Sequence, residues 1–168
     1  LGGRPLFPEK VVGITISGET VQIARVTQKR SGALITATEE FVIPEGEAKT
    51  HAQRLSTVLK RIAPTITADT HVRVSYPSAK VITKEITVPF LEREKICKVV
   101  EYEVEPSIPF NLDNAVVDFI IMHQSEVKQS STILVVAAQL DEVKKHLELF
   151  EKAGLPVHSL TIDAFALA

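Results

Sequence analysis

The alternation of apolar and polar residues along the first half of the chain predicts β-strands interrupted by one helix. Ser17-Gly18-Glu19 and Ser31-Gly32 are turn sequences, so the first three strands are expected to form an antiparallel meander. Pro64 ends the helix, because a residue that precedes proline disfavours the helical region. The expected elements are strands over residues 11–16, 21–26, 33–43, 72–76 and 82–88, and a helix over about 48–63.

A second group of elements follows Pro89. Apolar residues recur at helical spacing between Ile96 and Val104, which predicts a helix of about three turns. Strands are then expected over residues 115–122 and 132–138, followed by a helix, a strand over 157–162 and the start of another helix. Asp163 is expected to cap that last helix. The whole order is β-β-β-α-β-β, then α-β-β-α-β.

Composition limits the class of protein without identifying it. The 168 residues suffice for one ordinary domain or two small modules, and 45% apolar with 24% charged residues is a globular composition. A net charge of −2 gives no reason to expect nucleic acid as a partner. No apolar run is long enough to span a bilayer. The single cysteine, Cys97, excludes an internal disulfide and is compatible with a reducing compartment.

Few residues offer candidate chemistry. The five histidines are scattered, and none pairs with another at metal-ligand spacing, so we expect no metal site. Cys97 has no identifiable partner base, and a packed or partly exposed thiol is the better interpretation. The segment GITISGETVQIARV, residues 13–26, is the exception, because a strand, a glycine turn and a second strand can form either a phosphate-binding hairpin or a plain one.

Four segments resemble the PilM family, actin-like proteins of type IV pilus assembly that are related to FtsA and, distantly, to the cytoplasmic part of the type II secretion L protein. Together they cover the chain from about residue 11 to its end, and their order and spacing carry the resemblance. The segments are GITISGETVQIARV, VPFLEREKICKVVEYEVEPSIPFNLDNAVVDFII, ILVVAAQLDEVKKHLELFEKAGL and IDAFALA.

The resemblance implies an α/β (α+β) fold of the actin-like ATPase superfamily. A flexible leader is expected over residues 1–10 and a ribonuclease-H-like subdomain, 1A, over 11–88. An inserted SHS2-like subdomain, 1C, is expected over 89–162, and residues 163–168 would begin a returning helix. The second half of the fold is expected to be absent, as in a fragment of a longer protein.

The first hairpin departs from the family's phosphate loop. By the resemblance, Thr15 stands at the position of an aspartate that helps to hold hydrated Mg²⁺, Ser17 at that of a glycine and Gln22 at that of a lysine. Gly13 and Gly18 remain as turn residues. Threonine supplies no carboxylate charge and Gln22 no cation, so we favour an ordinary hairpin over a working phosphate site. The chain is therefore expected to be no enzyme and to hold no cofactor, although the longer protein could still bind ATP and Mg²⁺.

The resemblance also implies a partner. In the PilM family the N-terminal cytoplasmic tail of an inner-membrane protein, PilN, docks in extended form between subdomains 1A and 1C. Here Pro89-Phe90 and Ile108-Pro109-Phe110 bracket the predicted second helix, and they fit either a groove for such a tail or packing of the module junction.

The function implied is a non-enzymatic scaffold of a type IV pilus or type II secretion platform. Such a scaffold would lie in the cytoplasm at the inner membrane of a bacterium, and it could form homo-oligomers. The alternatives are a nucleotide-binding actin-like ATPase and an FtsA-like division protein. An intact second phosphate hairpin in the other half of the fold would favour the ATPase, and an amphipathic C-terminal helix would favour the division protein.

Overall fold

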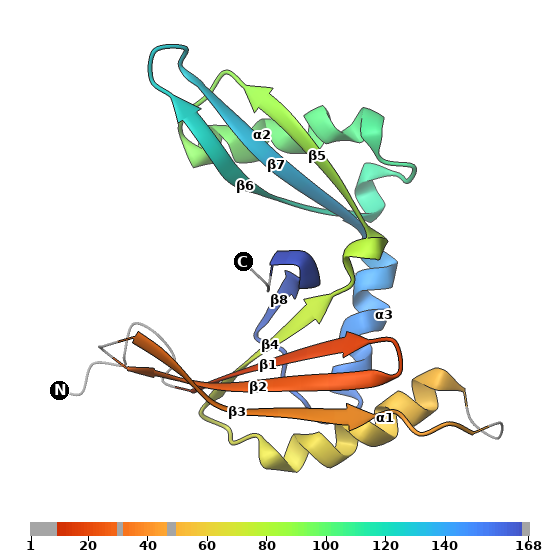
Figure 1. The fold of residues 1–168 in the computed structure, drawn as a ribbon. Coiled ribbons are helices and arrows are strands. Elements are labelled where there is room, and N and C mark those ends of the chain that lie inside the picture. Colours follow the sequence, from red (N-terminus) through yellow and green to blue (C-terminus); the bar gives the residue numbers. More distant parts are fainter. Residues whose placement is uncertain (1–9, 30–31, 47–49, 166–168) are drawn as a thin grey trace. The chain divides into compact units, whose positions relative to one another are not determined.

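The computed structural model describes residues 10–29, 32–46 and 50–165. Within them, the strands and α-helices follow the order expected from the sequence (Figure 1). The strands are β1 (Lys10–Ser17), β2 (Thr20–Lys29), β3 (Gly32–Val42), β4 (Thr70–Tyr76), β5 (Val81–Val88), β6 (Ala115–Ser125), β7 (Ser130–Gln139) and β8 (Ser159–Ile162). The α-helices are α1 (His51–Ile62), α2 (Arg93–Val104) and α3 (Leu140–Glu151). Short 3-10 turns are η1 (Ala63–Thr65), η2 (Ser78–Lys80), η3 (Glu105–Ser107), η4 (Leu112–Asn114) and η5 (Asp163–Phe165).

The two ends of the chain differ from the prediction in detail. Lys10 already begins β1, and the rest of the predicted leader lies outside the described residues. Asp163–Phe165 form a 3-10 turn where the start of a helix was expected, and residues 166–168 lie outside the described part.

The described residues divide into two compact units. The first unit takes its residues from 1–78 and 145–168, and the second unit is Ala79–Lys144. These limits differ from the predicted limits of 11–88 and 89–162, because strand pairing reassigns two strands. β5 pairs with β7 in the second unit, and β8 pairs with β4 in the first. Pairing between strands far apart in sequence decides the assignment, and a local pattern does not reveal it.

The first unit contains a five-stranded sheet in the order β3-β2-β1-β4-β8. The meander of β1, β2 and β3 is antiparallel as predicted, whereas β4 runs parallel to β1 and β8 runs parallel to β4. Gly18 has φ of 56° in the turn between β1 and β2, a left-handed conformation that glycine adopts without steric cost. Because β1, β4 and β8 run parallel, their carboxyl ends lie at the same end of the sheet.

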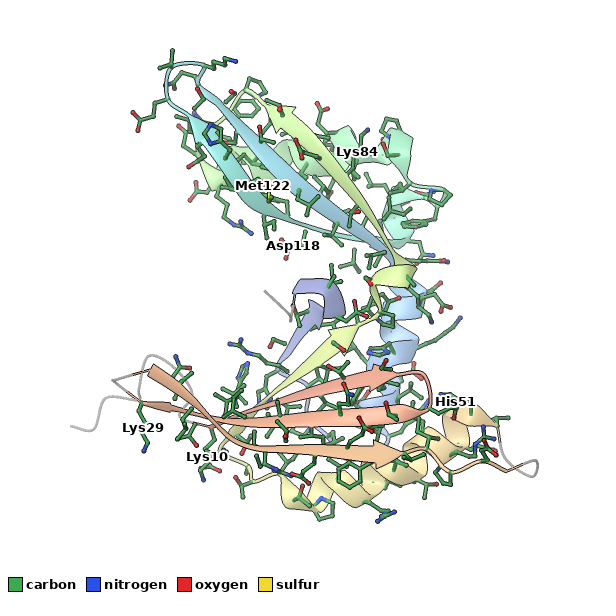
Figure 2. The ribbon with its side chains drawn as sticks, viewed as in Figure 1. Lys10, Lys29, His51, Lys84, Asp118 and Met122 are labelled. Carbon is green, nitrogen blue, oxygen red and sulfur yellow. The ribbon has the colours of Figure 1, made fainter. Side chains whose placement is uncertain are left out.

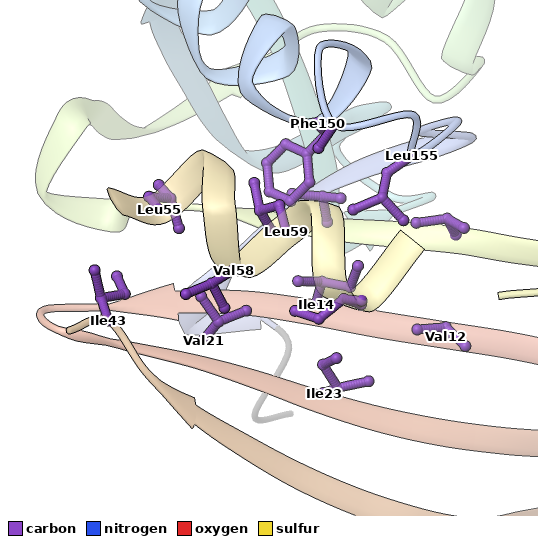
Figure 3. Close-up of a cluster of buried hydrophobic side chains, with 14 residues drawn as sticks. Val12, Ile14, Val21, Ile23, Ile43, Leu55, Val58, Leu59, Phe150 and Leu155 are labelled. Atoms are coloured by element: carbon purple, nitrogen blue, oxygen red, sulfur yellow. The ribbon is translucent and has the colours of Figure 1, made fainter. Parts of the chain in front are cut away.

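One face of this sheet packs on α1 and the end of α3 (Figure 3). Val12 and Ile14 of β1 alternate with residues of the other face and are buried against Leu59 of α1 and Phe150 of α3. Thr50 begins α1 with a capping box: its hydroxyl accepts from Gln53 N–H while the Gln53 side chain accepts from Thr50 N–H. The core of the first unit thus lies on one side of its sheet.

The second unit contains a three-stranded antiparallel sheet in the order β5-β7-β6, with α2 on one face. Ile96, Val100 and Val104 of α2 are buried against the alternate residues Ile133 and Val135 of β7. The predicted apolar stripe of the second helix is confirmed by this packing.

Two histidines meet where β4 and β8 pair. The ring centroids of His71 and His158 are 4.8 Å apart. Val72 N–H donates to His158 Nδ1 at 3.1 Å, which fixes the His158 ring beside His71. Desolvation, followed by the charges of His158 and Arg73, lowers the pKa of His71 from its ordinary value. The fold therefore favours neutral His71.

The buried ring of Phe150 is expected to contribute strongly to stability. Phe150→Ala removes a fully buried side chain, so the free energy of unfolding should fall by about 3–5 kcal/mol. Val127→Ala is the control, because Val127 is 97% exposed and its loss should change the value by no more than about 0.5 kcal/mol. Urea unfolding followed by circular dichroism measures both. Equal effects of the two substitutions would contradict the placement of Phe150 in the core.

Acidification is expected to destabilise the first unit through His71. A histidine whose folded pKa lies below its unfolded value of about 6.5 binds fewer protons in the folded state, so stability is full above that pH and falls below it. His71→Asn should reduce the loss of unfolding free energy between about pH 7.5 and pH 5.5. His123→Asn, at an exposed histidine of β6, should leave it unchanged. Urea unfolding across this range tests both, and an unchanged pH slope in the His71 variant would refute the assignment.

Candidate functional site

The face of the first sheet opposite its core carries a pocket of about 960 Å³. Gly13 and Thr15 alternate with the buried Val12 and Ile14, so they lie on this open face. Strand register places Gln22 of β2 opposite Thr15 and Glu40 of β3 opposite Gln22. The pocket is lined by Gly13, Thr15, Ser17, Gln22, Ile23, Ala24, Thr38, Glu39, Glu40, Ser78, Asp163 and Ala164.

The structure brings together four of the five residues predicted for the phosphate loop. Gly13, Thr15, Ser17 and Gln22 line the pocket, whereas Gly18 lies in the β1–β2 turn and is exposed. Of the two glycines among these five residues, Gly18 is the one whose backbone conformation favours glycine. A Cβ built at Gly13 would meet just the Ala24 carbonyl oxygen, at 4.0 Å, so the floor of the pocket has room.

Asp163 and Ser78 extend the pocket beyond the hairpin. They follow β8 and β4, and Asp163 Oδ1 accepts hydrogen bonds from Ser78 N–H at 2.9 Å and Ala164 N–H at 2.7 Å. Burial alone would raise the pKa of Asp163, but these hydrogen bonds outweigh it and hold the pKa below its ordinary value. From the sequence, Asp163 was expected only to cap a helix. Its place directly after a parallel strand was the available signal, because ligands of α/β sheets gather at the carboxyl ends of strands.

The pocket is acidic. Gln22, at the position of the family's lysine, donates from Nε2 to Glu40 Oε2 at 2.9 Å. Glu39 accepts from Arg25 Nε at 2.6 Å, so its charge is already paired, and Asp163 supplies the second pocket carboxylate beside Glu40. Neither lysine nor arginine occurs among the residues described as lining it. A nucleotide's phosphates would meet carboxylates here without the cation that normally neutralises them.

A second pocket of about 570 Å³ shares Gly13 and Thr15 with the first and has the opposite character. Arg73 lies between Gly13 and Ser159 in the strand register, and His71 lies on the same strand two residues before it. Hydroxyls of Ser75, Ser159 and Thr161 complete its polar lining. Arg73 and His71 thus line the second pocket, whereas the carboxylates of Glu40 and Asp163 line the first.

The residues predicted to form a partner groove are held within the second unit. Phe90, Ile108 and Phe110 are partly buried against its core, and Pro89 and Pro109 are exposed. The carbonyl of Phe90 accepts from Ser131 Oγ at 2.6 Å, which fixes the chain where it enters α2. Ser107 Oγ, just before Ile108, accepts from Lys84 Nζ at 2.5 Å. These residues serve packing of their own unit, and whether they also contact a partner stays a prediction.

The sheet of the second unit has an open apolar face opposite α2. Strand register aligns Ile120 with Leu134, and Val116 with Ala138 and Val81. Val116 is 39% exposed and Ile120 is 44% exposed. We call this set the open apolar face; it consists of Val81, Val116, Ile120, Leu134 and Val136, beside the buried Ala138. This face was not predicted from the sequence. The run ILVVAA of β7, which is apolar on both faces of the strand, was the signal that could have indicated it.

Carboxylates flank the open apolar face on both outer strands. Glu85 of β5 lies opposite Leu134, and Asp118 of β6 lies opposite Val136. Asp118 is 82% exposed and 3.5 Å from Arg93, an exposed ion pair of small energetic weight. Figure 2 shows Asp118 and Met122 on the same strand, and Met122, 59% exposed at the bulge of β6, adds further apolar surface. This face can hold an apolar segment that carries positive charge.

Two further classes of site are absent from the described part of the chain. Over residues 10–29, 32–46 and 50–165, His, Cys, Asp and Glu nowhere gather in a group that could hold a metal ion. None of the helices described has the length and apolar character needed to cross a membrane.

Comparison with known proteins gives a family match and similar folds. Residues 13–168 match the family described as type IV pilus assembly protein PilM. The solved "PilM-PilN type IV pilus biogenesis complex" is similar with a TM-score of 0.78 and 22% identity, over 96% of this chain and 49% of that one. The cytoplasmic domain of EpsL, an inner-membrane component of the type II secretion system of Vibrio cholerae, has a TM-score of 0.60 and 12% identity, over 90% of this chain and 57% of that one.

The chain spans about half the length of these solved chains. No curated protein matches it by sequence. Both solved structures share the fold of this chain over at least 90% of its length, in agreement with the mixed α/β (α+β) class that the resemblance implied. Because the family match begins within β1 and extends over both units to residue 168, the chain belongs to the PilM family of type IV pilus assembly proteins.

Proposed function

We propose that this chain is a non-enzymatic scaffold of a type IV pilus assembly platform, or of a related type II secretion platform, which holds the cytoplasmic tail of an inner-membrane protein. The family match and the similarity to a PilM–PilN complex support the pilus role. The scaffold would act in the cytoplasm of a bacterium, at the inner membrane.

The open apolar face of the second unit carries this proposal. Soluble proteins rarely leave contiguous apolar area uncovered, and such area commonly marks an interaction site. Five apolar residues from three strands form it, with Glu85 and Asp118 beside them. A tail with a few aliphatic residues and one or two lysines or arginines would cover the apolar area and place positive charge near the carboxylates.

The residues Pro89, Phe90, Ile108, Pro109 and Phe110 remain the alternative docking residues. Three of them already contribute to the core of the second unit. A partner that used them would need to bind the parts of these side chains that remain exposed.

The acidic pocket of the first unit supports the non-enzymatic part of the proposal. Thr15 supplies no metal-binding charge, and Gln22 is engaged by Glu40. An ATPase would need a cation here to offset the carboxylates of Glu40 and Asp163. The alternative functions, an active actin-like ATPase and an FtsA-like division protein, would therefore depend on residues supplied by another part of a longer protein.

A peptide titration tests docking. The probe is a synthetic peptide with the sequence of the N-terminal cytoplasmic tail of the PilN-like protein of the same organism, added to ¹⁵N-labelled chain. We expect saturable NMR shifts on β6 and β7. Ile120→Thr should weaken binding at least about ten-fold, because it keeps β-branching but removes apolar area.

Tyr102→Asp is the matched control. Tyr102 is 69% exposed on α2, which covers the other face of the sheet, so its substitution should leave affinity unchanged. Shifts confined to Phe90 and Phe110 would show that the peptide binds the groove predicted from the sequence and not the open apolar face. The absence of shifts at millimolar peptide would reject docking on this chain.

Nucleotide titration tests the loss of phosphate chemistry. We expect isothermal calorimetry with Mg²⁺-ATP and with Mg²⁺-ADP to give no saturable heat at millimolar nucleotide, because the pocket lacks a cationic side chain. The companion variant Glu40→Gln, which removes one pocket carboxylate and keeps the amide partner for Gln22, should not create binding by itself. Saturable binding of either nucleotide by the parent chain in the micromolar range would contradict the proposal of a non-enzymatic scaffold.

A further inference from the structure

The edge strand β3 is long, and its first part is uncharged, although it carries one bulge. Among the described residues it forms one edge of the five-stranded sheet and is paired on one side only, with β2 (Figure 1). An edge strand presents unpaired N–H and C=O groups, and natural proteins usually protect such edges with charge, proline, brevity or a bulge. At 11 residues β3 is long, whereas the opposite edge, β8, has only four.

The first part of β3 carries no charge. Residues 32–38, Gly-Ala-Leu-Ile-Thr-Ala-Thr, contain neither an acidic nor a basic side chain, and Glu39 and Glu40 follow them. Leu34 is 55% exposed and Ile35 is 65% exposed. These are neighbours in the strand, so they project on opposite faces of the sheet and apolar surface is available on both.

This absence of charge determines which partner suits the edge. In an antiparallel pair of two identical strands each residue near the two-fold axis lies opposite itself or a close neighbour, so charged residues would meet like charges. The uncharged segment escapes that penalty. The edge strands of the second unit do not, since β5 carries Lys84 and Glu85, and β6 carries Asp118.

We propose that β3 pairs with the β3 of a second copy of this chain, antiparallel, with Ile35 at the two-fold axis. This register pairs residues 33–37 of the two copies and keeps Glu39 and Glu40 outside the paired segment. Backbone hydrogen bonds join the two sheets into one, and the two Ile35 side chains contact each other. The site is separate from the pocket and from the open apolar face, so it does not depend on the scaffold function proposed above.

A bulge limits the strength of the pair. The register of β3 shifts opposite Arg25 and Val26, and the Thr36 hydroxyl donates to the Arg25 carbonyl at 3.1 Å. A bulge twists the strand and interrupts regular pairing, so only a few residues around Ile35 can join. The interface is therefore smaller than the roughly 1,200 Å² of a stable complex, and we expect a weak dimer with a dissociation constant in the micromolar range or above.

Sedimentation velocity over a range of concentrations tests the pair. The parent chain should show a reversible monomer–dimer equilibrium. Ile35→Lys should weaken it at least about ten-fold, because two like charges would meet at the axis. Val42→Lys, at a residue of the same strand that is 68% exposed, should leave it unchanged. Both positions are exposed, and circular dichroism confirms that the variants fold.

Cysteine cross-linking tests the register. In a Cys97→Ser background, which removes the exposed native thiol, Ile35→Cys should form a disulfide-linked dimer on mild oxidation. Val42→Cys should not, since the two copies of residue 42 would lie far apart. A parent chain that stays monomeric at every concentration would overturn the proposal. So would a dimer that survives Ile35→Lys, or cross-linking at residue 42 that equals that at residue 35.

Discussion

The two-residue period of β1 is the constraint on which the first unit depends. Val12 and Ile14 point to the core, so Gly13 and Thr15 must point to the open face. Because β1 lies between β2 and β4, the same alternation sets which side chains of both neighbours face outward. A shift of one residue in β1 would exchange the core for the pocket, so the hydrophobic core fixes the identity of the pocket residues.

The sequence was informative wherever the pattern is local. It predicted every α-helix and strand that the structure describes, and their order, because hydrophobic period and turn residues report nearby structure. It did not reveal that β5 pairs with β7 and β8 with β4, since these partners lie far away along the chain. For the same reason it found Gln22 but not Glu40, its hydrogen-bond partner on the next strand. Four of the twelve residues that line the pocket were predicted, and all four come from the β1–β2 hairpin.

The two units keep different kinds of surface uncovered. The open face of the first sheet is polar, with carboxylates in one pocket and Arg73 with His71 in the other. The open face of the second sheet is apolar with only two carboxylates beside it. A polar face loses little by remaining in water, whereas an apolar face gains free energy from being covered. We therefore expect a binding partner to contact the open face of the second unit rather than that of the first. The uncharged edge of β3 is the exception in the first unit.

The ends of the second unit lie next to each other within its own sheet. Val81, near its beginning, is paired with Ala138, near its end, and Lys80 Nζ lies 3.3 Å from Glu142 Oε2. A module whose entry and exit are adjacent can be gained or lost in evolution without rerouting the rest of the chain. For the same reason the second unit could be exchanged as a module between relatives. It could also be produced alone, with new termini at the two adjacent positions where the chain enters and leaves it.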